Sequence, residues 1–209
     1  MIILIGSEKG GCGKSTTATN ICALLAGEGK DVCLVDADQQ STSSNWIADR
    51  DASGGLPKIH CVQKYGNIRD TLLDLNARYE FVIVDAAGRD SKELRTAMTA
   101  ADTLVIPFRP SQADLDTLAN MVEHMESAKI YNPNLVVKGL ITMAPTNPVI
   151  QETSQTKKYL NDLPAINLLR TVIFDRKIYR DAVSEGLGVT EMKNQKAKSE
   201  IQSLMGEIA

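Results

Sequence analysis

A glycine-rich stretch near the N-terminus carries a lysine and a hydroxyl group in an order that suits a bound phosphate. It follows the apolar run 2–5, and Lys14 and Ser15 come directly after its last glycine. Glycines let several backbone N–H groups crowd around one anion, and a helix that starts there adds unpaired N–H groups and the positive end of its dipole. The lysine supplies a charge for β- and γ-phosphates, and the hydroxyl group can ligate Mg²⁺. The expected phosphate-binding residues are Gly10, Gly11, Cys12, Gly13, Lys14, Ser15 and Thr16.

The stretch departs from the usual G-x-x-x-x-G-K-[ST] pattern in two respects. Glu8 stands at the position of the first glycine, and a second lysine, Lys9, stands five residues before Lys14. A chance glycine-rich turn between a strand and a helix is the alternative interpretation. The order of apolar run, loop and helix start favours the phosphate site, because this is the structural context that the pattern requires.

Carboxylates follow two further apolar runs of the chain. Asp36 and Asp38 come at the end of the run 31–35, and Asp85 ends the run 81–84. The carboxyl ends of parallel strands meet at the edge where ligands bind in open α/β sheets, so we expect these side chains beside the glycine-rich loop. Asp85 then has the position of a carboxylate that holds Mg²⁺ through water. A helix N-cap at Asp38 is an alternative role that does not exclude a catalytic one.

Short apolar runs alternate with segments of helical period along the chain, and this alternation predicts an α/β fold. We expect a doubly wound, mostly parallel sheet with helices on both faces, formed by one domain that spans residues 1–209. The predicted strands cover residues 2–5, 31–35, 58–62, 81–85, 103–107, 135–142 and 169–174. The predicted helices cover residues 17–28, 67–78, 111–131, 151–160 and 193–208, with a further helix that ends before Gly186 and a turn-rich loop at 51–57.

The combination of Lys9 with Lys14 resembles the deviant Walker A loop of the ParA/MinD family of P-loop ATPases. The run 36–40 is similar to that family's Asp-x-Asp-Pro-Gln pattern, with a glutamine in place of the proline. Residues 40–46 and 171–180 look like the corresponding stretches of the small ParF-type plasmid partition ATPases. The resemblance covers the whole chain and implies the P-loop NTPase fold.

The resemblance also implies a role for each candidate residue. Lys9 reaches across a nucleotide-sandwich dimer to the partner's phosphates, Lys14 serves the phosphates of its own subunit, and Asp38 orients or deprotonates the attacking water. Residues 86–90 resemble the mobile switch that senses the γ-phosphate, while a phenylalanine at position 174, where many relatives have proline, leaves the adenine edge open. The implied residues of the Mg²⁺ site are Ser15, Asp36 and Asp85, and the implied neighbours of the ATP adenine are Thr142 and Met143.

The function implied by the resemblance is ATP-driven segregation of plasmid or chromosomal DNA. ATP closes a dimer that binds DNA non-specifically, and a centromere-binding protein of the ParB or ParG kind stimulates hydrolysis and releases the DNA. The expected DNA-binding residues are Arg176, Lys177 and Arg180, although a solvated helix face explains this charge run equally well. The formal net charge of −3 requires a local basic patch, because the surface as a whole does not attract nucleic acid.

Composition narrows the other possibilities. The chain has no apolar run of the roughly 18 residues that a membrane span needs and no secretion signal, so we expect a cytoplasmic, nucleoid-associated protein without a membrane partner. The four cysteines include no C-x-x-C pair, which predicts reduced thiols, and none follows Asp85, where a nitrogenase iron protein needs cluster ligands. A MinD-like membrane cycler needs a basic amphipathic tail, but here Glu200 and Glu207 interrupt the last helix. A DNA-transfer ATPase of the VirC1 kind and a small-molecule ligase or kinase of the same superfamily remain alternative functions.

Overall fold

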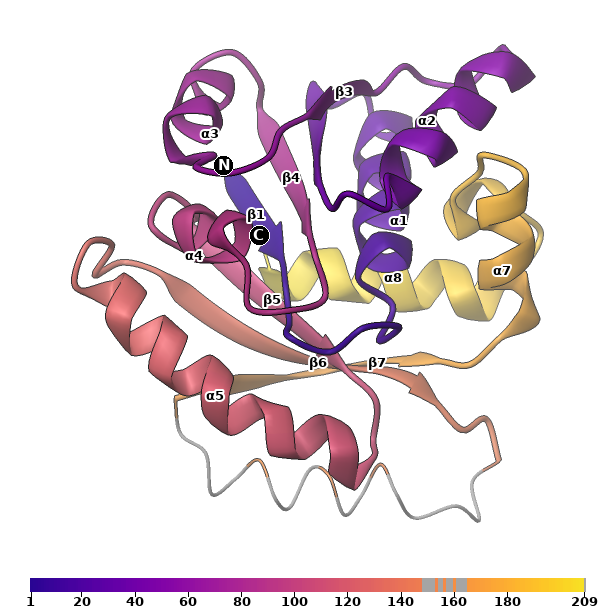
Figure 1. The fold of residues 1–209 in the computed structure, drawn as a ribbon. Coiled ribbons are helices and arrows are strands. Elements are labelled where there is room, and N and C mark those ends of the chain that lie inside the picture. The colour runs from indigo at the N-terminus through magenta and orange to yellow at the C-terminus, as the bar shows by residue number, and fades with distance from the viewer. Residues whose placement is uncertain (148–152, 154–155, 157–159, 161–164, 209) are drawn as a thin grey trace.

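The computed structural model has a parallel β-sheet between two layers of helices (Figure 1). The structure describes residues 1–147, 153, 156, 160 and 165–208. Within them, seven strands run in the order β3-β2-β4-β1-β5-β6-β7, and each neighbouring pair is parallel. The strands are β1 (Ile2–Ile5), β2 (Val32–Ala37), β3 (His60–Gln63), β4 (Phe81–Ala86), β5 (Thr103–Phe108), β6 (Val136–Ala144) and β7 (Asn167–Phe174).

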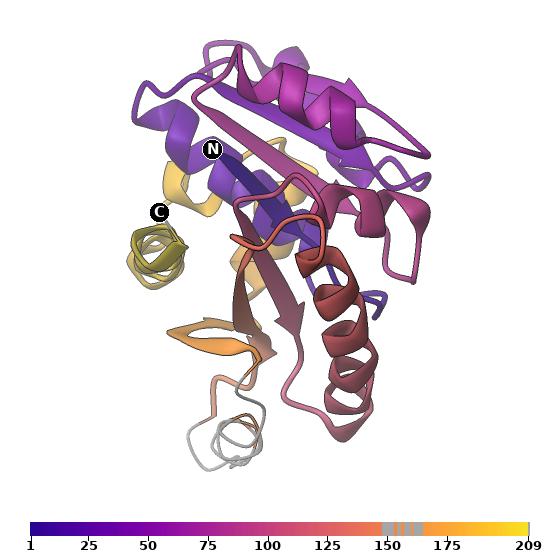
Figure 2. The same cartoon turned by 90° about the vertical axis from the view of Figure 1, so that its left-hand side faces the viewer.

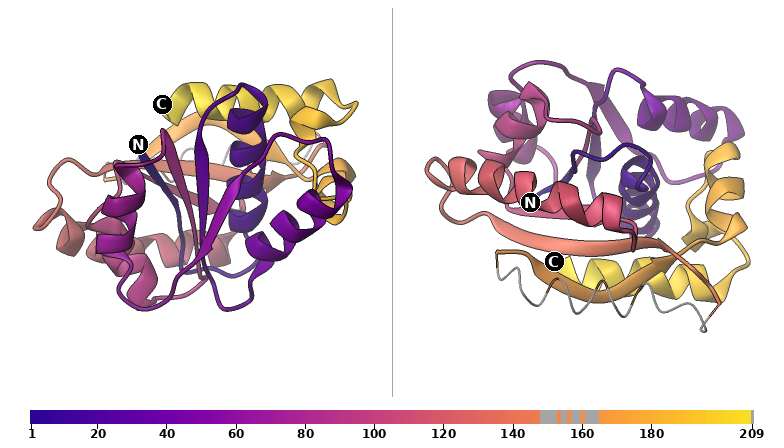
Figure 3. Two further views of the ribbon diagram at one scale, coloured as in Figure 1. Left: turned by 90° about the horizontal axis from the view of Figure 1, so that it is seen from above. Right: turned by 60° about the horizontal axis from the view of Figure 1, so that its bottom comes forward.

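Helices cover both faces of the sheet. Figure 2 shows α5 and α8 on opposite sides of the strands, and the view from above in Figure 3 shows the same for α2 and α3. On one face lie α3 (Arg69–Asn76), α4 (Lys92–Met98) and α5 (Gln112–Lys129). On the other lie α1 (Lys14–Gly27), α2 (Thr42–Ser53), α7 (Lys177–Ser184), the short 3₁₀ helix η1 (Val189–Glu191) and α8 (Gln195–Ile208).

The central strand β1 explains why the sheet needs both layers. Its side chains alternate between two apolar cores, because Ile2 and Leu4 pack with the α3–α5 side and Ile3 and Ile5 pack with the α1–α8 side. All four side chains are buried. A strand covered on both faces reads as an unbroken apolar run, which is the pattern of a buried parallel strand. The predicted doubly wound α/β architecture is therefore confirmed.

The register of the strands brings the predicted chemistry to one edge of the sheet. Asp85 of β4 pairs with Ile5 of β1 on one side and with Asp36 of β2 on the other. The glycine-rich loop leaves β1 directly after Ile5, so it begins next to both carboxylates. This arrangement follows from the parallel strand order alone, since every strand presents its carboxyl end at the same edge.

The structure has one helix that the sequence does not predict, and two predicted segments differ from it or lie outside the described residues. Helix α4 was not predicted; it is only seven residues long, and its N-cap Ser91 accepts a hydrogen bond from the Leu94 N–H at 3.1 Å. The turn-rich loop predicted at 51–57 begins too early, because α2 continues to Ser53. The helix predicted at 151–160 lies, apart from residues 153, 156 and 160, outside the described residues.

Candidate active site

The glycine-rich loop joins β1 to α1 in a conformation that leaves the first turn of the helix open to a ligand. Gly11 and Gly13 adopt the left-handed region, with φ angles of 70° and 87°, where a side chain would be strained. Gly13 is also the N-cap of α1, and it offers no side chain to cap the helix. The N–H groups of the first turn therefore have no capping side chain and can bind an anion.

Lys14 is buried, with 7% of its surface exposed, and its side chain bends back over its own loop. Its Nζ donates a hydrogen bond to the backbone oxygen of Lys9 at 2.7 Å. Within the described part of the chain, no carboxylate lies within ion-pair distance of Lys14 or of Lys9. The loop thus has two cations whose positive charges are not neutralised by a direct partner.

Asp85 is the carboxylate whose geometry suits a metal ion. Its Oδ2 accepts a hydrogen bond from the Ser43 hydroxyl at 2.6 Å, while its buried Oδ1 has no hydrogen-bond partner among the described residues. Burial raises the pKa of Asp85 to about 6, whereas the Ser43 and Ser15 hydroxyls and the Lys14 charge favour the ionised form. A free carboxylate oxygen near a serine hydroxyl is the kind of oxygen site that Mg²⁺ takes.

In the part of the chain that the structure describes, no cluster of three or more His, Cys, Asp or Glu side chains could hold a metal ion. Mg²⁺ usually takes one or two protein ligands and completes its shell with water and substrate phosphates. Ser15 and Asp85 together meet that requirement once a phosphate lies on the loop.

Asp36 has a different environment from its neighbour Asp85. Its Oδ1 accepts a hydrogen bond from the Asp38 N–H at 3.1 Å, and its Oδ2 accepts from the Ser44 N–H at 2.8 Å and the Ser44 hydroxyl at 2.7 Å. Both oxygens are therefore occupied by the chain, and Asp36 ties the start of α2 to the end of β2. Its predicted contribution to the Mg²⁺ shell stays a prediction.

Asp38 is half-buried and lies at the wall of the cavity in front of the loop. Its Oδ1 accepts a hydrogen bond from the Gln40 N–H at 3.0 Å, which forms a local turn. The N-cap of α2 is Ser41, so the alternative role of Asp38 as a helix N-cap is wrong. Asp38 thus lines the cavity beside the loop, and its catalytic role stays a prediction.

Two cavities meet at the loop and together have room for a nucleotide. The larger, of about 600 Å³, is lined by Gly10, Gly11, Gly13, Lys14, Ser15, Thr16, Asp38, Gln39, Gln40, Thr42, Ala87, Gly88, Arg89 and Met143. The smaller, of about 250 Å³, shares Gly13, Thr16 and Met143 with it and is otherwise lined by Thr17, Thr142, Ile173, Phe174, Asp175, Arg176, Tyr179, Arg180 and Val183. The first is polar and suits phosphates, and the second is mostly apolar and suits a base.

Thr142, in the wall of the smaller cavity, is joined to the glycine-rich loop by a hydrogen bond. Its Oγ1 donates to the backbone oxygen of Cys12 at 2.7 Å and also lies 3.1 Å from the backbone oxygen of Phe108. Met143 follows with a φ angle of 51°, which is uncommon for a residue other than glycine. The two residues that were expected near a base thus lie beside the loop. The Cys12 side chain is fully buried and lines neither cavity.

The segment after β4 lies directly on the phosphate loop. A Cβ atom at Gly88 would come within 2.7 Å of the Lys14 Nζ and 2.9 Å of the Gly10 Cα, so only glycine fits there in this conformation. The next residue, Arg89, is exposed and lines the larger cavity. Residues 88–89 therefore lie next to Lys14 and the loop, and their role in sensing the γ-phosphate stays a prediction.

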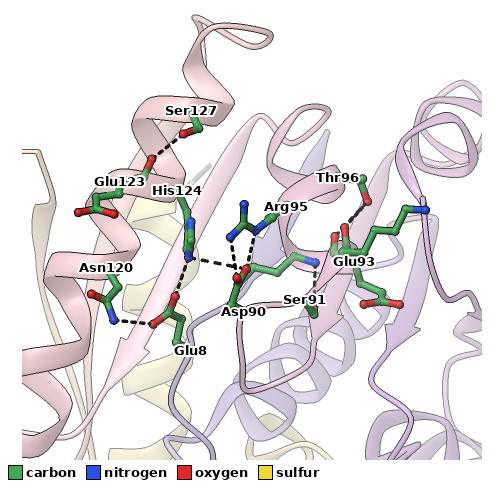
Figure 4. A network of polar contacts seen from close by, with 12 residues as sticks. Glu8, Asp90, Ser91, Glu93, Arg95, Thr96, Asn120, Glu123, His124 and Ser127 are labelled. Carbon is green, nitrogen blue, oxygen red and sulfur yellow. Dashed lines mark hydrogen bonds and ion pairs between the residues drawn. The ribbon is translucent and has the colours of Figure 1, made fainter.

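The sequence did not indicate how the loop is attached to α5. Glu8 Oε1 lies 2.7 Å from His124 Nε2, and its Oε2 accepts a hydrogen bond from Asn120 Nδ2 at 3.3 Å (Figure 4). His124 also lies 3.7 Å from Asp90 Oδ1, and Asp90 forms two 2.6 Å contacts with Arg95. The glutamate at a glycine position is the only signal of this attachment in the sequence. Asn120 and His124 are four residues apart, so they share one helix face.

Arg109 is a second residue of the site that the sequence did not indicate. It follows β5, and its Nη2 donates a hydrogen bond to the backbone oxygen of Gly11. Its position directly after a buried strand is the same kind of signal that singled out Asp85.

The three expected DNA-binding residues lie together at the start of α7, but each has a carboxylate partner. Arg176 lies 2.8 Å from Glu200, Lys177 lies 2.7 Å from Asp181, and Arg180 lies 2.7 Å from Asp175. The Lys177 and Arg180 side chains are 80% and 68% exposed. The guanidinium of Arg176 also lies over the ring of Phe174, at 5.1 Å from its centroid. Contact with DNA stays a prediction for all three.

Comparisons with known proteins give consistent results. The family model of the ATPase MipZ matches residues 1–139. The chain is 30% identical over 214 residues to the maintenance of carboxysome distribution protein A of Halothiobacillus neapolitanus, with 99% of this chain and 95% of that protein covered. It is 26% identical to the sporulation initiation inhibitor protein Soj of Bacillus subtilis, with 88% of each covered.

A solved structure shares the fold. The putative plasmid partition protein of Borrelia burgdorferi bound to AMPPNP superposes with a TM-score of 0.73, at 18% identity and with 99% of each chain covered. In the part of the chain that the structure describes, no helix is both long and apolar enough to cross a membrane.

Proposed function

The chain belongs to the MipZ/ParA family of ATPases, and from this membership we propose that it segregates plasmid or chromosomal DNA by cycles of ATP binding and hydrolysis. The observation that carries the proposal is the pair Lys9 and Lys14 on one glycine-rich loop, neither of which has a carboxylate partner in the described structure. Two such cations suit a triphosphate that one subunit binds through Lys14 and a second subunit contacts through its Lys9. The Borrelia burgdorferi plasmid partition protein, which has the same fold, was solved with an ATP analogue.

In this proposal ATP binds across both cavities. Its phosphates lie on the loop in the larger cavity, where a phosphate oxygen replaces the Lys9 carbonyl as the partner of the Lys14 Nζ. Its adenine lies in the smaller cavity beside Thr142 and Met143. Bound Mg²⁺ supplies the neutralisation of phosphate charge, and Ser15 and Asp85 are the residues that would hold it.

In this proposal, residues of the chain itself position the water and stabilise the charge during hydrolysis. Asp38 orients the attacking water at the wall of the cavity, and the two lysines stabilise the charge that develops on the phosphates. Gly88 and Arg89 register the loss of the γ-phosphate, because they lie against Lys14 and the loop. The reaction is phosphoryl transfer to water.

The ATP-bound chain acts as a dimer. Lys9 of each subunit reaches the phosphates of the other, which requires a two-fold axis and makes the interface depend on nucleotide. The dimer binds nucleoid DNA without sequence preference, in part through Arg176, Lys177 and Arg180. A centromere-binding partner of the ParB or ParG kind stimulates hydrolysis and returns the chain to monomers.

The test is the nucleotide dependence of DNA binding. A labelled duplex of random sequence is titrated with the protein in the presence of Mg²⁺ and either a non-hydrolysable ATP analogue or ADP, with fluorescence anisotropy as the readout. We expect binding with the ATP analogue and weak binding with ADP. Equal binding in both states would overturn the ATP-dependent cycle, and no binding in either state would overturn the proposal and favour a small-molecule ligase or kinase.

A second candidate function is the positioning of carboxysomes. It is favoured by the identity of 30% over nearly the whole length of the Halothiobacillus neapolitanus protein, whose name assigns it to carboxysome distribution. For this chain, we propose the same ATP-dependent dimer for both functions, which then differ in the cargo. Deletion of the gene separates them: loss of a plasmid or chromosome from daughter cells supports DNA segregation. Normal DNA inheritance with misplaced carboxysomes supports the second function, and normal inheritance without such a defect leaves a VirC1-like role in DNA transfer.

A further inference from the structure

Two adjacent serines in the first turn of α2 hold two carboxylates that are paired across neighbouring strands. The Ser43 hydroxyl donates to Asp85 Oδ2 at 2.6 Å, and the Ser44 hydroxyl donates to Asp36 Oδ2 at 2.7 Å. Asp36 and Asp85 face each other in the register between β2 and β4. The start of α2 therefore lies over the strand ends from which the site is built.

Asp36 and Asp85 differ in the hydrogen bonds that their carboxylate oxygens accept. Asp36 has a donor on each oxygen, because Asp38 and the backbone of Ser44 also bind it. Asp85 accepts the Ser43 hydrogen bond on Oδ2, whereas its Oδ1 has no partner at hydrogen-bond distance and angle in the described part of the chain, although the nearby Ser15 hydroxyl favours the ionised carboxylate. Ser43 and Asp85 are both almost fully buried, so bulk water does not replace the missing donor. A buried carboxylate oxygen without a hydrogen-bond donor lowers the stability of the fold unless a ligand supplies the missing contact.

The hydroxyl of Ser43 also restricts the rotation of the Asp85 carboxylate. Turning the carboxylate would break a charge-assisted hydrogen bond of 2.6 Å in a buried environment, where such bonds are strong. Oδ1 is thus kept as the oxygen that remains available. A residue that fixes the orientation of a metal-binding carboxylate typically changes metal affinity by about 10-fold to 100-fold when it is removed.

Helix α2 is itself held firmly at its other end. Trp46 Nε1 donates to the backbone oxygen of Leu187 at 3.1 Å, and the buried Arg50 makes contacts of 2.7 and 2.8 Å with the Glu191 carboxylate. These contacts join α2 to the segment around η1. Ser43 is therefore presented to Asp85 from a helix that cannot shift freely along the sheet.

We propose that Ser43 is a positioning residue of the Mg²⁺ site, which holds Asp85 Oδ2 so that Oδ1 receives a metal-bound water. This inference rests on the proposed Mg²⁺–ATP site, and it adds a residue that the loop and the strand-end carboxylates do not reveal. Ser44, one position along the same turn, holds Asp36 instead, and both oxygens of Asp36 already accept hydrogen bonds from the chain. The two serines thus differ in function although they differ little in position.

The test measures the Mg²⁺ dependence of nucleotide binding, not catalysis. A fluorescent ATP analogue is titrated into the full chain, first in EDTA and then at increasing Mg²⁺ concentrations. For Ser43→Ala we expect the Mg²⁺ concentration at half-saturation to rise by about 10-fold or more, with an unchanged affinity in EDTA. Ser43→Thr, which keeps the hydroxyl, should restore the wild-type value. The matched control Ser44→Ala should lower the melting temperature and leave the Mg²⁺ half-saturation within about twofold.

The outcomes separate this inference from the proposed function. An unchanged Mg²⁺ half-saturation in Ser43→Ala, or an equal loss of affinity in EDTA and in Mg²⁺, would overturn the positioning role. Wild-type protein that binds no ATP analogue, or binds it without any response to Mg²⁺, would instead overturn the proposed function. If Ser43→Ala does not fold, Ser43→Cys keeps a similar volume with a weaker donor, and the same rise in half-saturation is expected for it.

Discussion

Lys14 of the phosphate loop lines the larger cavity, and Arg176 and Arg180 near the start of α7 line the smaller one, yet the partners of the two basic groups differ in charge. Lys14 donates to a neutral backbone carbonyl, and Lys9 has no carboxylate partner among the described residues. Arg176, Lys177 and Arg180 each face a carboxylate. In the sequence the two groups look alike, since both are short basic clusters near a strand end.

The difference decides what each group can do with a phosphate. A lysine that leaves a carbonyl for a phosphate gains a charge-assisted contact, which is about twice as strong as a neutral one. An arginine that leaves a carboxylate for a phosphate exchanges one ion pair for another and gains little. The number of positive charges in a segment is therefore a weak guide to anion binding until the partner of each charge is known.

We expect the largest effect, on ATP turnover, from Asp38, a carboxylate that lies beside the loop and does not neutralise one of its cations. Asp38→Ala should lower ATP turnover by about 10²-fold to 10⁴-fold, because the water loses its orienting group. ATP affinity should stay within a few-fold, since the phosphate contacts remain. Release of phosphate and binding of a fluorescent ATP analogue are measured on the same samples, with Asp70→Ala on α3 as the control. Turnover within a few-fold of wild type would show that Asp38 only forms the local turn.

Removal of the buried loop lysine is expected to have the next largest effect. Lys14→Ala should weaken ATP binding by roughly 30-fold to 150-fold, which corresponds to about 2–3 kcal/mol for a hydrogen bond to a charged group. The control is Lys30→Ala, which removes an exposed lysine that is paired with Glu80. Unchanged affinity in Lys14→Ala, measured with a fluorescent ATP analogue, contradicts the assignment of the loop.

Lys9 tests whether the second loop cation acts between subunits. Lys9→Gln should bind ATP as a monomer and weaken dimerisation by about 10-fold to 100-fold, because each subunit loses one charged contact to the other's phosphate. Light scattering with a non-hydrolysable ATP analogue measures the mass, and DNA binding should decrease together with it. A variant that still doubles its mass with wild-type affinity rules out the sandwich dimer for this protein.

The smallest effect is expected at α7. Replacing Arg176, Lys177 and Arg180 together by alanine should weaken DNA binding only a few-fold, because their carboxylates already neutralise them. The slope of log affinity against log salt should become shallower by about 0.9 for each duplex phosphate contact that is lost. The paired variant Asp175→Asn with Asp181→Asn frees Arg180 and Lys177, and it should steepen that slope. No change in either variant would assign the cluster to a solvated helix face.

The sequence was a good guide wherever a function depends on neighbouring positions. The loop from Gly10 to Thr16, the buried strands and the position of Asp85 all follow from local pattern and strand order. The pair Lys177–Asp181 was equally within reach, because residues four apart on a helix are neighbours. These features need no knowledge of the packed structure.

The features that the sequence did not give depend on partners far along the chain. Ser43 meets Asp85 after 42 residues, and Arg176 meets Glu200 after 24. Helix α4 was missed for another reason: it has seven residues and therefore no clear helical period. Only the folded sheet determines which polar side chains come together, so their roles could not be assigned before the structure was known.

The central place of β1 has a consequence for the order in which the molecule forms. β1 pairs with β4 and β5, and its last residue, Ile5, precedes the end of β5 at Phe108 by about 100 residues. A ribosome that adds about 5–20 residues per second needs roughly 5–20 s to make that interval. β4, which ends at Ala86, is the first of the two strands to become available, and both neighbours of β1 are present only after Phe108 has been made. The first catalytic element to be synthesised therefore gains its complete strand neighbours only after about half of the chain has been made.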